Sequence, residues 1–293
     1  MSNLQDDNPF LKFKARNLFL WFFIISILVG IASEIIIIYT GFSRKDPIMT
    51  NIYYCLSFGL LCVWVLRRFY KLKINVRYLI GNFPKGYNLL PVFGLVVAAL
   101  TFSLGAGLLS FYVLSLIAPS FWESLLKSMN ADQAKFSSVP ILYNSLKVFS
   151  LVLVAPITEE FLFRGVLLHR WATKWGITPA ILSSSILFGC LHMNPFGASI
   201  FGIVMTLLYF KTRTLIVPMI AHSMNNFLTI YIHFSKAQTN SANFHLWFGL
   251  LCVVLSAPFL VRFIYKKWPN QRISLPYFAN ASQLMPHISY VGW

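Results

Sequence analysis

The chain alternates long apolar runs with short polar and basic connections. A helix needs about 20 apolar residues to cross the hydrocarbon core of a bilayer, and eight runs approach that length. They are, in chain order, 18–40, 51–66, 89–117, 141–157, 178–193, 196–210, 215–233 and 243–264. This pattern predicts an all-α, polytopic integral membrane bundle of about eight transmembrane helices.

Between the fourth and fifth runs, the segment 158–171 has a helical pattern but carries charge. We interpret it as a continuation of the fourth span. Proline removes a backbone donor and clashes with the preceding helical turn, so we expect a kink or a break near Pro156. The connection 118–140 is expected to hold a short surface helix, and the polar, proline-containing segment 268–293 is expected to be irregular.

The basic residues predict the orientation. They precede the first run and follow the second, fourth, sixth and eighth runs, whereas the alternate connections are poor in them. Basic loops stay on the cytoplasmic side of a membrane, so an even number of spans with both termini cytoplasmic is expected. We therefore predict that residues 1–293 form a single transmembrane domain with cytoplasmic tails at 1–17 and 268–293.

The composition supports a membrane protein. The chain is 57% hydrophobic and only 11% charged, with a mean hydropathy of +0.68, whereas a soluble domain carries about 25% charged residues. The net charge of +16 could suggest a nucleic-acid partner. The basic residues flank apolar runs and form no stripe on a soluble face, so we expect the bilayer and no nucleic acid as a partner.

Three charged residues stand out within one apolar stretch, APITEEFLFRGVLLHR. Charge at membrane depth costs several kcal/mol, and such groups face a protein interior or a water-filled cavity. Glu160 and Arg164 are four residues apart, so they share a helix face and can pair. Glu159 lies about 100° away around the helix. One glutamate can thus be held by arginine while the other meets water or substrate.

Two further polar pairs lie in later apolar runs. FGCLH places Phe188 and His192 on one helix face, and HSMNN places His222 and Asn226 on one face. A neutral imidazole can orient water, contact an oxyanion or bind a metal. An amide adds a donor for developing negative charge, and a glutamate in an apolar site suits a general base. Together these groups could activate water and hydrolyse an amide inside a membrane.

Each feature also has a structural interpretation. A Glu–Arg pair can fix two helices, a single histidine can be a satisfied core residue, and Asn225 and Asn226 can join helices by hydrogen bonds. Glu34 is interpreted as structural. The remaining histidines lie near run ends or in polar segments, where solvated roles are expected: His169, His233, His245 and His287.

EEFLFR, FGCLH and HSMNN, in this order, resemble the motifs EExxxR, FxxxH and HxxxN/D of the CPBP family of intramembrane proteases. This CAAX-processing and bacteriocin-processing group, which includes the Abi proteins, is related to the Ras-converting enzyme. The resemblance covers roughly 140–235, which we take as the catalytic core. The matching residues are Glu159, Glu160, Arg164, Phe188, His192, His222 and Asn226.

The resemblance implies a site in a cavity reached from the cytoplasm or from the membrane. It implies that Glu159 activates water and that His192 helps to position it. Glu160 and Arg164 would brace the helix, with Phe188 in support. His222 and Asn226 would stabilise the oxyanion. Spacing alone does not decide which glutamate is the base; the choice of Glu159 follows the resemblance and the better placement of Arg164 for its neighbour.

The resemblance also bears on metal and substrate. The family is commonly labelled metal-dependent, and His192, His222 and Glu159 could make a three-ligand zinc site with one open position. The chain has no HExxH motif, and a metal-free glutamate–water mechanism uses the same residues, so we favour no tightly bound metal. The Ras-converting relatives cut after a prenylated cysteine, so a membrane-associated or lipidated peptide is the expected substrate.

These residues are compatible with three functions, of which an intramembrane endopeptidase is the one we favour. A non-catalytic immunity or scaffold protein of the same fold would keep the Glu–Arg pair yet tolerate loss of His192 or His222. A proton-coupled transporter could use Glu159 and both histidines as a relay, but transporters show paired repeats with broken helices in both halves. Here the polar residues concentrate between 159 and 226 without such symmetry.

Overall fold

Every regular element of the computed structural model is helical within the residues it describes, which are 8–41, 46–133, 140–236, 246–271 and 273–284. The α-helices are α1 (Pro9–Lys12), α2 (Ala15–Thr40), α3 (Pro47–Lys71), α4 (Val76–Ile80), α5 (Leu90–Ile117), α6 (Pro119–Gln133), α7 (Pro140–Phe149), α8 (Ala155–Glu160), α9 (Leu168–Trp175), α10 (Ile177–Cys190), α11 (Pro195–Thr212), α12 (Ile216–Lys236), α13 (Leu246–Lys267) and α14 (Pro276–Leu284). Two π-helical stretches, η1 (Ser150–Val154) and η2 (Phe161–Leu167), lie between α7 and α9.

Each of the eight predicted runs coincides with a helix. Within the described ranges, five helices are long and apolar enough to cross a membrane: α2, α3, α5, α11 and α13. α10 is apolar but has only 14 residues, and α12 and the α7–α9 segment fall outside that set. The structure confirms a polytopic helical membrane fold, while the number of spans stays a prediction.

The segment 140–175 is continuously helical, so the expected break at Pro156 is absent. Pro156 lies in the first turn of α8, and the π-helical η1 immediately precedes it. The wider turn of a π-helix leaves room for the proline ring that a regular α-helix would not. The helix therefore runs without a break through the charged residues that follow.

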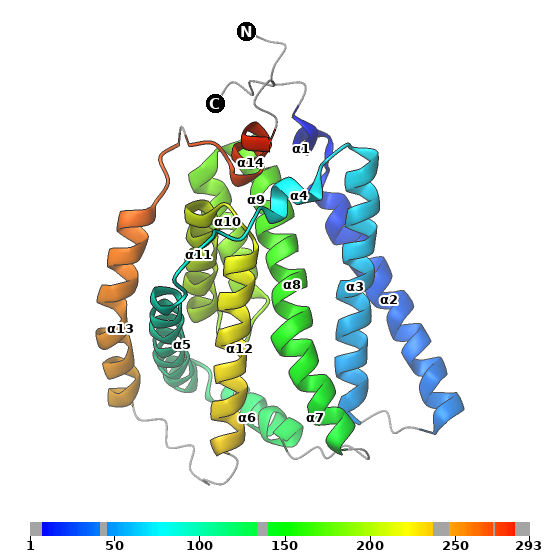
Figure 1. The fold of residues 1–293 in the computed structure, drawn as a ribbon. Coiled ribbons are helices and arrows are strands. Elements are labelled where there is room, and N and C mark those ends of the chain that lie inside the picture. Colours follow the sequence, from blue (N-terminus) through cyan, green and yellow to red (C-terminus); the bar gives the residue numbers. More distant parts are fainter. Residues whose placement is uncertain (1–7, 42–45, 134–139, 237–245, 272, 285–293) are drawn as a thin grey trace.

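The helices stand side by side, with α1 and α14 at one end of the bundle and α6 at the other (Figure 1). The predicted surface helix in 118–140 is thus present as α6. Basic residues occupy the last turns of α3, α9, α11 and α13, all of which end near α14. The two described ends of the chain share this basic end, as the charge pattern predicts; its cytoplasmic location stays a prediction.

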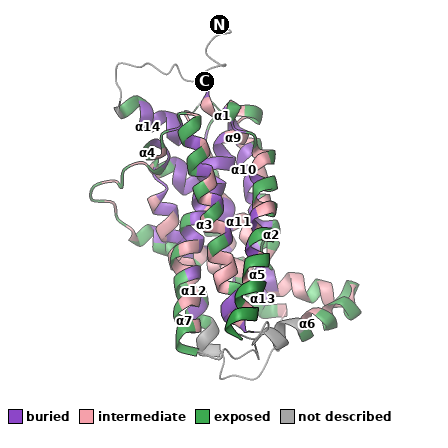
Figure 2. Ribbon diagram, turned by 90° about the vertical axis from the view of Figure 1, so that its right-hand side faces the viewer, coloured by how far each residue is buried: buried purple, intermediate pink, exposed green. Residues whose placement is uncertain are grey.

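The outer helix α2 carries many exposed residues, whereas the inner helix α11 is mostly buried (Figure 2). Only 11% of the apolar window of α2 is buried, against 56% of that of α11. Phe23 on α2 and Val254 on α13 are both more than 60% exposed. A belt of exposed apolar residues of this extent is stable against lipid and unfavourable in water. The bundle therefore has the surface of an integral membrane protein.

The helices α5 and α13 cross closely at a glycine. A methyl group added at Gly105 would lie 2.7 Å from the carbonyl oxygen of Gly249 and 2.9 Å from the Cβ of Cys252. Small residues allow this kind of approach between membrane helices, where backbone contact replaces side-chain packing. α5 also contacts the inner helices α11 and α12, which lie at the candidate site.

The prediction that 268–293 are irregular is wrong for residues 276–284, because they form α14. Tyr277 and Phe278 of this helix are buried, and their rings pack edge-on against Phe10 of α1 at centroid distances of 5.1 and 6.2 Å. The backbone N–H of Tyr277 also donates to Nε2 of His169 at 3.3 Å. The prediction failed because the polar composition of this segment gives no sign of the short helix α14, whose aromatic residues pack on the end of the bundle.

Candidate active site

The two glutamates of the EEFLFR motif lie in the short helix α8, between the two π-helical stretches. π-Helical turns are rare and occur frequently at functional sites. Here they widen the helix on both sides of Glu159 and Glu160. This local geometry sets the directions in which the two carboxylates point.

Glu160 and Arg164 form the predicted pair in the core of the protein. The Nη1 of Arg164 donates to Oε1 of Glu160 at 3.1 Å, and both side chains are at most 2% exposed. The Nη2 of Arg164 donates to the carbonyl oxygen of Gly202 on α11 at 3.0 Å. The guanidinium carbon lies 4.8 Å from the ring centre of Phe188, a cation–π distance. The pair thus joins the α8 region to α10 and α11.

Glu159 faces a different set of partners. Its side chain is 12% exposed, and its Oε1 accepts a hydrogen bond from the hydroxyl of Tyr54 on α3 at 2.7 Å. Its Oε2 is buried and, among the residues that the structure describes, has no hydrogen-bond partner. That oxygen lies 4.0 Å from Nε2 of His192 and 3.9 Å from Nε2 of His222. Two histidines therefore converge on one unpaired carboxylate oxygen.

The prediction that His192 lies inside a membrane-spanning helix is wrong. Because α10 ends at Cys190, His192 lies in the turn between α10 and α11. Its Nδ1 is 2.7 Å from the carbonyl oxygen of Phe188. A carbonyl only accepts, so Nδ1 carries the hydrogen and Nε2 of the neutral ring is an acceptor. The rings of Phe188 and His192 lie 4.4 Å apart. The FxxxH spacing thus fixes the ring and its tautomer.

His222 of α12 sits between the two glutamates. Its Nδ1 donates to Oε1 of Glu160 at 2.9 Å, and its Nε2 faces Glu159. The ring is 3% exposed, and it packs edge-on against Phe201 at 5.2 Å. The carboxylate that Arg164 holds therefore also orients this histidine.

Asn226 and Ser223 connect α12 to the carbonyl groups of η1. The amide nitrogen of Asn226 donates to the carbonyl oxygen of Leu151 at 2.8 Å, and the hydroxyl of Ser223 donates to that of Val152 at 2.7 Å. These carbonyls are five and four positions before Pro156, which has no N–H to offer them. The two side chains supply the donors that the proline lacks. Asn226 thus has a structural contact beside its predicted role at an oxyanion.

His192, His222, Asn226 and Phe188 line one cavity of about 590 Å³. The other lining residues come from α5, from the turn between α10 and α11, from α11 and from the part of α12 that continues toward Ile232. α5 and α12 both run from the α14 end toward the α6 end (Figure 1). The cavity therefore lies in the half of the bundle away from α14, and the route by which it is reached stays a prediction.

The donors for the suggested zinc site have suitable chemistry but not the required spacing. Both histidines offer Nε2 while Nδ1 is held by an oxygen acceptor, as in many zinc sites. Ligands at 2.0–2.1 Å from a tetrahedral zinc ion lie about 3.3 Å from each other, whereas the Nε2–Oε2 distances to Glu159 are 3.9 and 4.0 Å. Within the described part of the chain, no group of three His, Cys, Asp or Glu residues could hold a metal.

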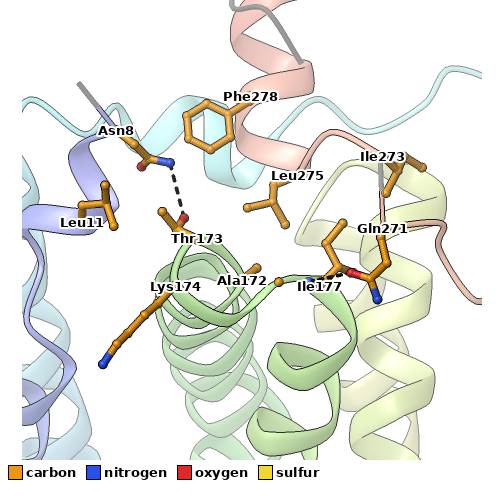
Figure 3. A pocket seen from close by; sticks show the side chains of 11 residues that line it. Asn8, Leu11, Ala172, Thr173, Lys174, Ile177, Gln271, Ile273, Leu275 and Phe278 are labelled. Atoms are coloured by element: carbon orange, nitrogen blue, oxygen red, sulfur yellow. Dashed lines mark hydrogen bonds between the residues drawn. The ribbon is translucent and has the colours of Figure 1, made fainter. Parts of the chain in front are cut away.

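A second cavity, of about 450 Å³, lies at the basic end between α1, α9 and the approach to α14 (Figure 3). Asn8 donates to Thr173 across it at 3.4 Å. Its ionisable lining residue, Lys174, extends away from the cavity in Figure 3. Among the described residues that line this cavity there is no acid–base pair, so we place the candidate chemistry at the cavity that His192 and His222 line.

Two residues differ from their sequence-based interpretation. His169 was expected to be solvated, yet it is fully buried and its Nδ1 donates to the carbonyl oxygen of Arg164 at 2.9 Å. Tyr54 was not singled out at all, because an aromatic residue in an apolar run gives no signal of its own. The side chain of His233, and residues 245 and 287, lie outside the described residues.

Comparison with known proteins yields one match. Residues 142–228 match the family model described as type II CAAX prenyl endopeptidase Rce1-like. The matched segment covers less than a third of the chain and contains all seven motif residues, so its description agrees with the resemblance that the three motifs carry. At family level it supports a CAAX-type intramembrane protease. Searches of curated proteins and of solved structures found no match.

Proposed function

We propose that the protein is an intramembrane endopeptidase that hydrolyses a peptide bond of a membrane-associated substrate with water activated by Glu159. One observation carries the proposal. A buried, unpaired carboxylate oxygen faces two histidine nitrogens beside a cavity, while the neighbouring carboxylate is neutralised by arginine. An unpaired acceptor in a dry site is costly, and a water molecule relieves that cost.

The distance between Oε2 of Glu159 and Nε2 of His192 suits a bound water molecule. A water within about 2.8 Å of each atom can bridge Oε2 of Glu159 and Nε2 of His192, which are 4.0 Å apart. It donates one hydrogen to each, and its oxygen lone pairs are then available for attack. His192 is thus a positioning group for the water, and Glu159 is the base that removes its proton.

The bond changes balance without a further reactant. The water oxygen bonds to the scissile carbonyl carbon as its proton moves to Glu159, which gives a tetrahedral oxyanion. The same proton then passes from Glu159 to the leaving amine nitrogen, and the carbon–nitrogen bond breaks. The oxyanion forms on the cavity side, where Asn226 can offer its second amide hydrogen and His222 can donate from a protonated Nε2.

The substrate we propose is a membrane-anchored peptide, including peptides with a prenylated cysteine of the CAAX type. The matching family is described as CAAX prenyl endopeptidases. The cavity has mostly apolar walls with a few amide and hydroxyl groups. It lies between α5 and α12, within the part of the bundle that the bilayer would surround, where an apolar anchor on the substrate would already be concentrated.

The test is cleavage by the purified protein in lipid nanodiscs. We would compare the wild type with Glu159→Gln and His222→Ala, using quenched fluorescent peptides anchored by a prenylated cysteine or by an apolar helix. Glu123→Gln on the exposed helix α6 is the matched control. We expect Glu159→Gln to lower kcat by about 10²- to 10⁴-fold, with unchanged melting temperature.

Other outcomes point elsewhere. Equal cleavage by all variants would exclude a base at Glu159. No cleavage of any peptide by the wild type would favour the immunity or scaffold interpretation. Each reaction is repeated with a chelator; our proposal expects no change, and loss of activity that added zinc restores would replace the metal-free mechanism.

A further inference from the structure

We propose that Tyr54 is a positioning residue for Glu159: its hydroxyl holds one carboxylate oxygen so that the other faces His192 and His222. This inference rests on the proposed function for its kinetic consequence. Tyr54 is on α3, outside the segment 142–228 that matches the protease family. It is absent from the three sequence motifs.

The hydrogen bond has a defined direction. An ionised carboxylate has no hydrogen, so the phenol of Tyr54 is the donor and Oε1 of Glu159 is the acceptor. The O···O distance of 2.7 Å is the usual one for a hydroxyl donor and lies at the upper end of the range for a charged acceptor. A carboxylate held at one oxygen loses rotation about its terminal bond. The unpaired Oε2 is then aimed at the histidines.

Tyr54 is itself fixed on two sides. Its ring packs on that of Phe58 at a centroid distance of 4.6 Å and an angle of 34°. One turn earlier on α3, Asn51 accepts a hydrogen bond from the hydroxyl of Ser150 in η1 at 3.1 Å. The α3 face with Asn51, Tyr54 and Phe58 therefore aligns with the catalytic helix and delivers the phenol to the glutamate.

A displacement of the base by a fraction of an ångström affects turnover more than binding. Substrate lies in the cavity formed by α5, α11 and α12, whereas Tyr54 approaches Glu159 from α3. Loss of the hydroxyl should therefore lower kcat and leave KM nearly unchanged. Misplacement of a reacting group by about 1 Å can cost roughly 100-fold, so we expect a 10- to 100-fold lower kcat for Tyr54→Phe.

The matched control is the neighbouring tyrosine. Tyr53→Phe removes the same atom from the same helix, but the hydroxyl of Tyr53 donates to the backbone carbonyl of Ser26 on α2 at 3.2 Å. We expect wild-type kinetics for Tyr53→Phe. For Tyr54→Phe we expect a lower kcat, a KM within twofold, and a melting temperature within a few degrees of wild type.

Infrared spectroscopy tests the contact without turnover. The protein is labelled with ¹³C-tyrosine, and the Tyr54 C–O stretching band is isolated by subtracting the spectrum of Tyr54→Phe. This band reports hydrogen donation, so it should shift when the subtraction is repeated in a Glu159→Leu background, which has no acceptor at this position. Equivalent spectra with and without Glu159→Leu would refute the hydrogen bond, whatever the activity.

The kinetic outcomes separate the two proposals. Wild-type kcat in Tyr54→Phe, or a loss of kcat that only accompanies unfolding, would overturn the positioning role. If wild type cleaves no peptide, the proposed function fails. The infrared shift then still decides whether Tyr54 holds the carboxylate.

Discussion

The buried pair of Glu160 and Arg164 offers the most direct test of how this site is held together. Arg164 is 1% exposed, and its guanidinium contacts Glu160, the carbonyl oxygen of Gly202 and the rings of Phe163 and Phe188. Arg164→Met keeps most of the side-chain volume and removes the charge. It leaves a fully buried carboxylate whose remaining partner is His222.

The expected cost follows from the unpaired charge. Removing one partner of a buried ion pair costs about 3–5 kcal/mol, because the remaining charge stays desolvated. At about 2–4 °C per kcal/mol for a large domain, the melting temperature should fall by roughly 6–20 °C. Replacing both partners with neutral groups removes the unpaired charge. The double variant Glu160→Gln/Arg164→Met should therefore be more stable than Arg164→Met alone.

Thermal unfolding in detergent, followed by intrinsic fluorescence, measures both variants against wild type. Arg67→Met, at an exposed position near the basic end of α3, is the control and should change stability by no more than about 0.5 kcal/mol. The reasoning is refuted if Arg164→Met melts with the control. It is also refuted if the double variant is less stable than the single one, because the pair would then contribute through something other than charge compensation.

Two further predictions concern packing at the bundle ends and crossings. Gly105→Val should destabilise the protein by about 1–3 kcal/mol because its side chain meets the backbone of α13, whereas Gly94→Val on the same helix meets nothing within 4 Å and should be tolerated; equal melting temperatures would contradict the close crossing. His169→Leu should cost about 1–3 kcal/mol, because one buried carbonyl and one buried N–H lose their partner. It should also speed proteolysis within α14, and an unchanged rate would contradict this anchoring role.

Much of the fold follows from hydropathy. Apolar runs of membrane-spanning length must become helices because no water is available to satisfy their backbone groups, and each of the eight predicted runs is helical over most of its described residues. Hydropathy does not show where side chains from another helix supply hydrogen bonds that the backbone of a helix lacks. The helix passes Pro156 because α12 donates to the freed carbonyls, a contact across more than 70 residues that no local pattern shows.

The candidate site was predictable where partners are close in sequence. Glu160 and Arg164 pair across one helical turn, and Phe188 accepts from His192 across another. The assignment of Asn226 was less complete, since spacing could place it near His222 but could not reveal its bond to Leu151. The long-range geometry that sets each side chain's direction needed the structure.

Tyr54 shows why a motif is a partial description of this site. The seven motif residues lie within 142–228, and contacts among six of them fix the glutamate pair, the arginine and the histidines, while Asn226 binds the carbonyl oxygen of Leu151. They leave one oxygen of Glu159 to be held from outside, by a phenol on α3. A chain could keep every motif residue and still lose turnover if α3 presented phenylalanine here. We therefore expect activity to depend on the contact of α3 with α8, the helix that carries Glu159, as well as on the motifs.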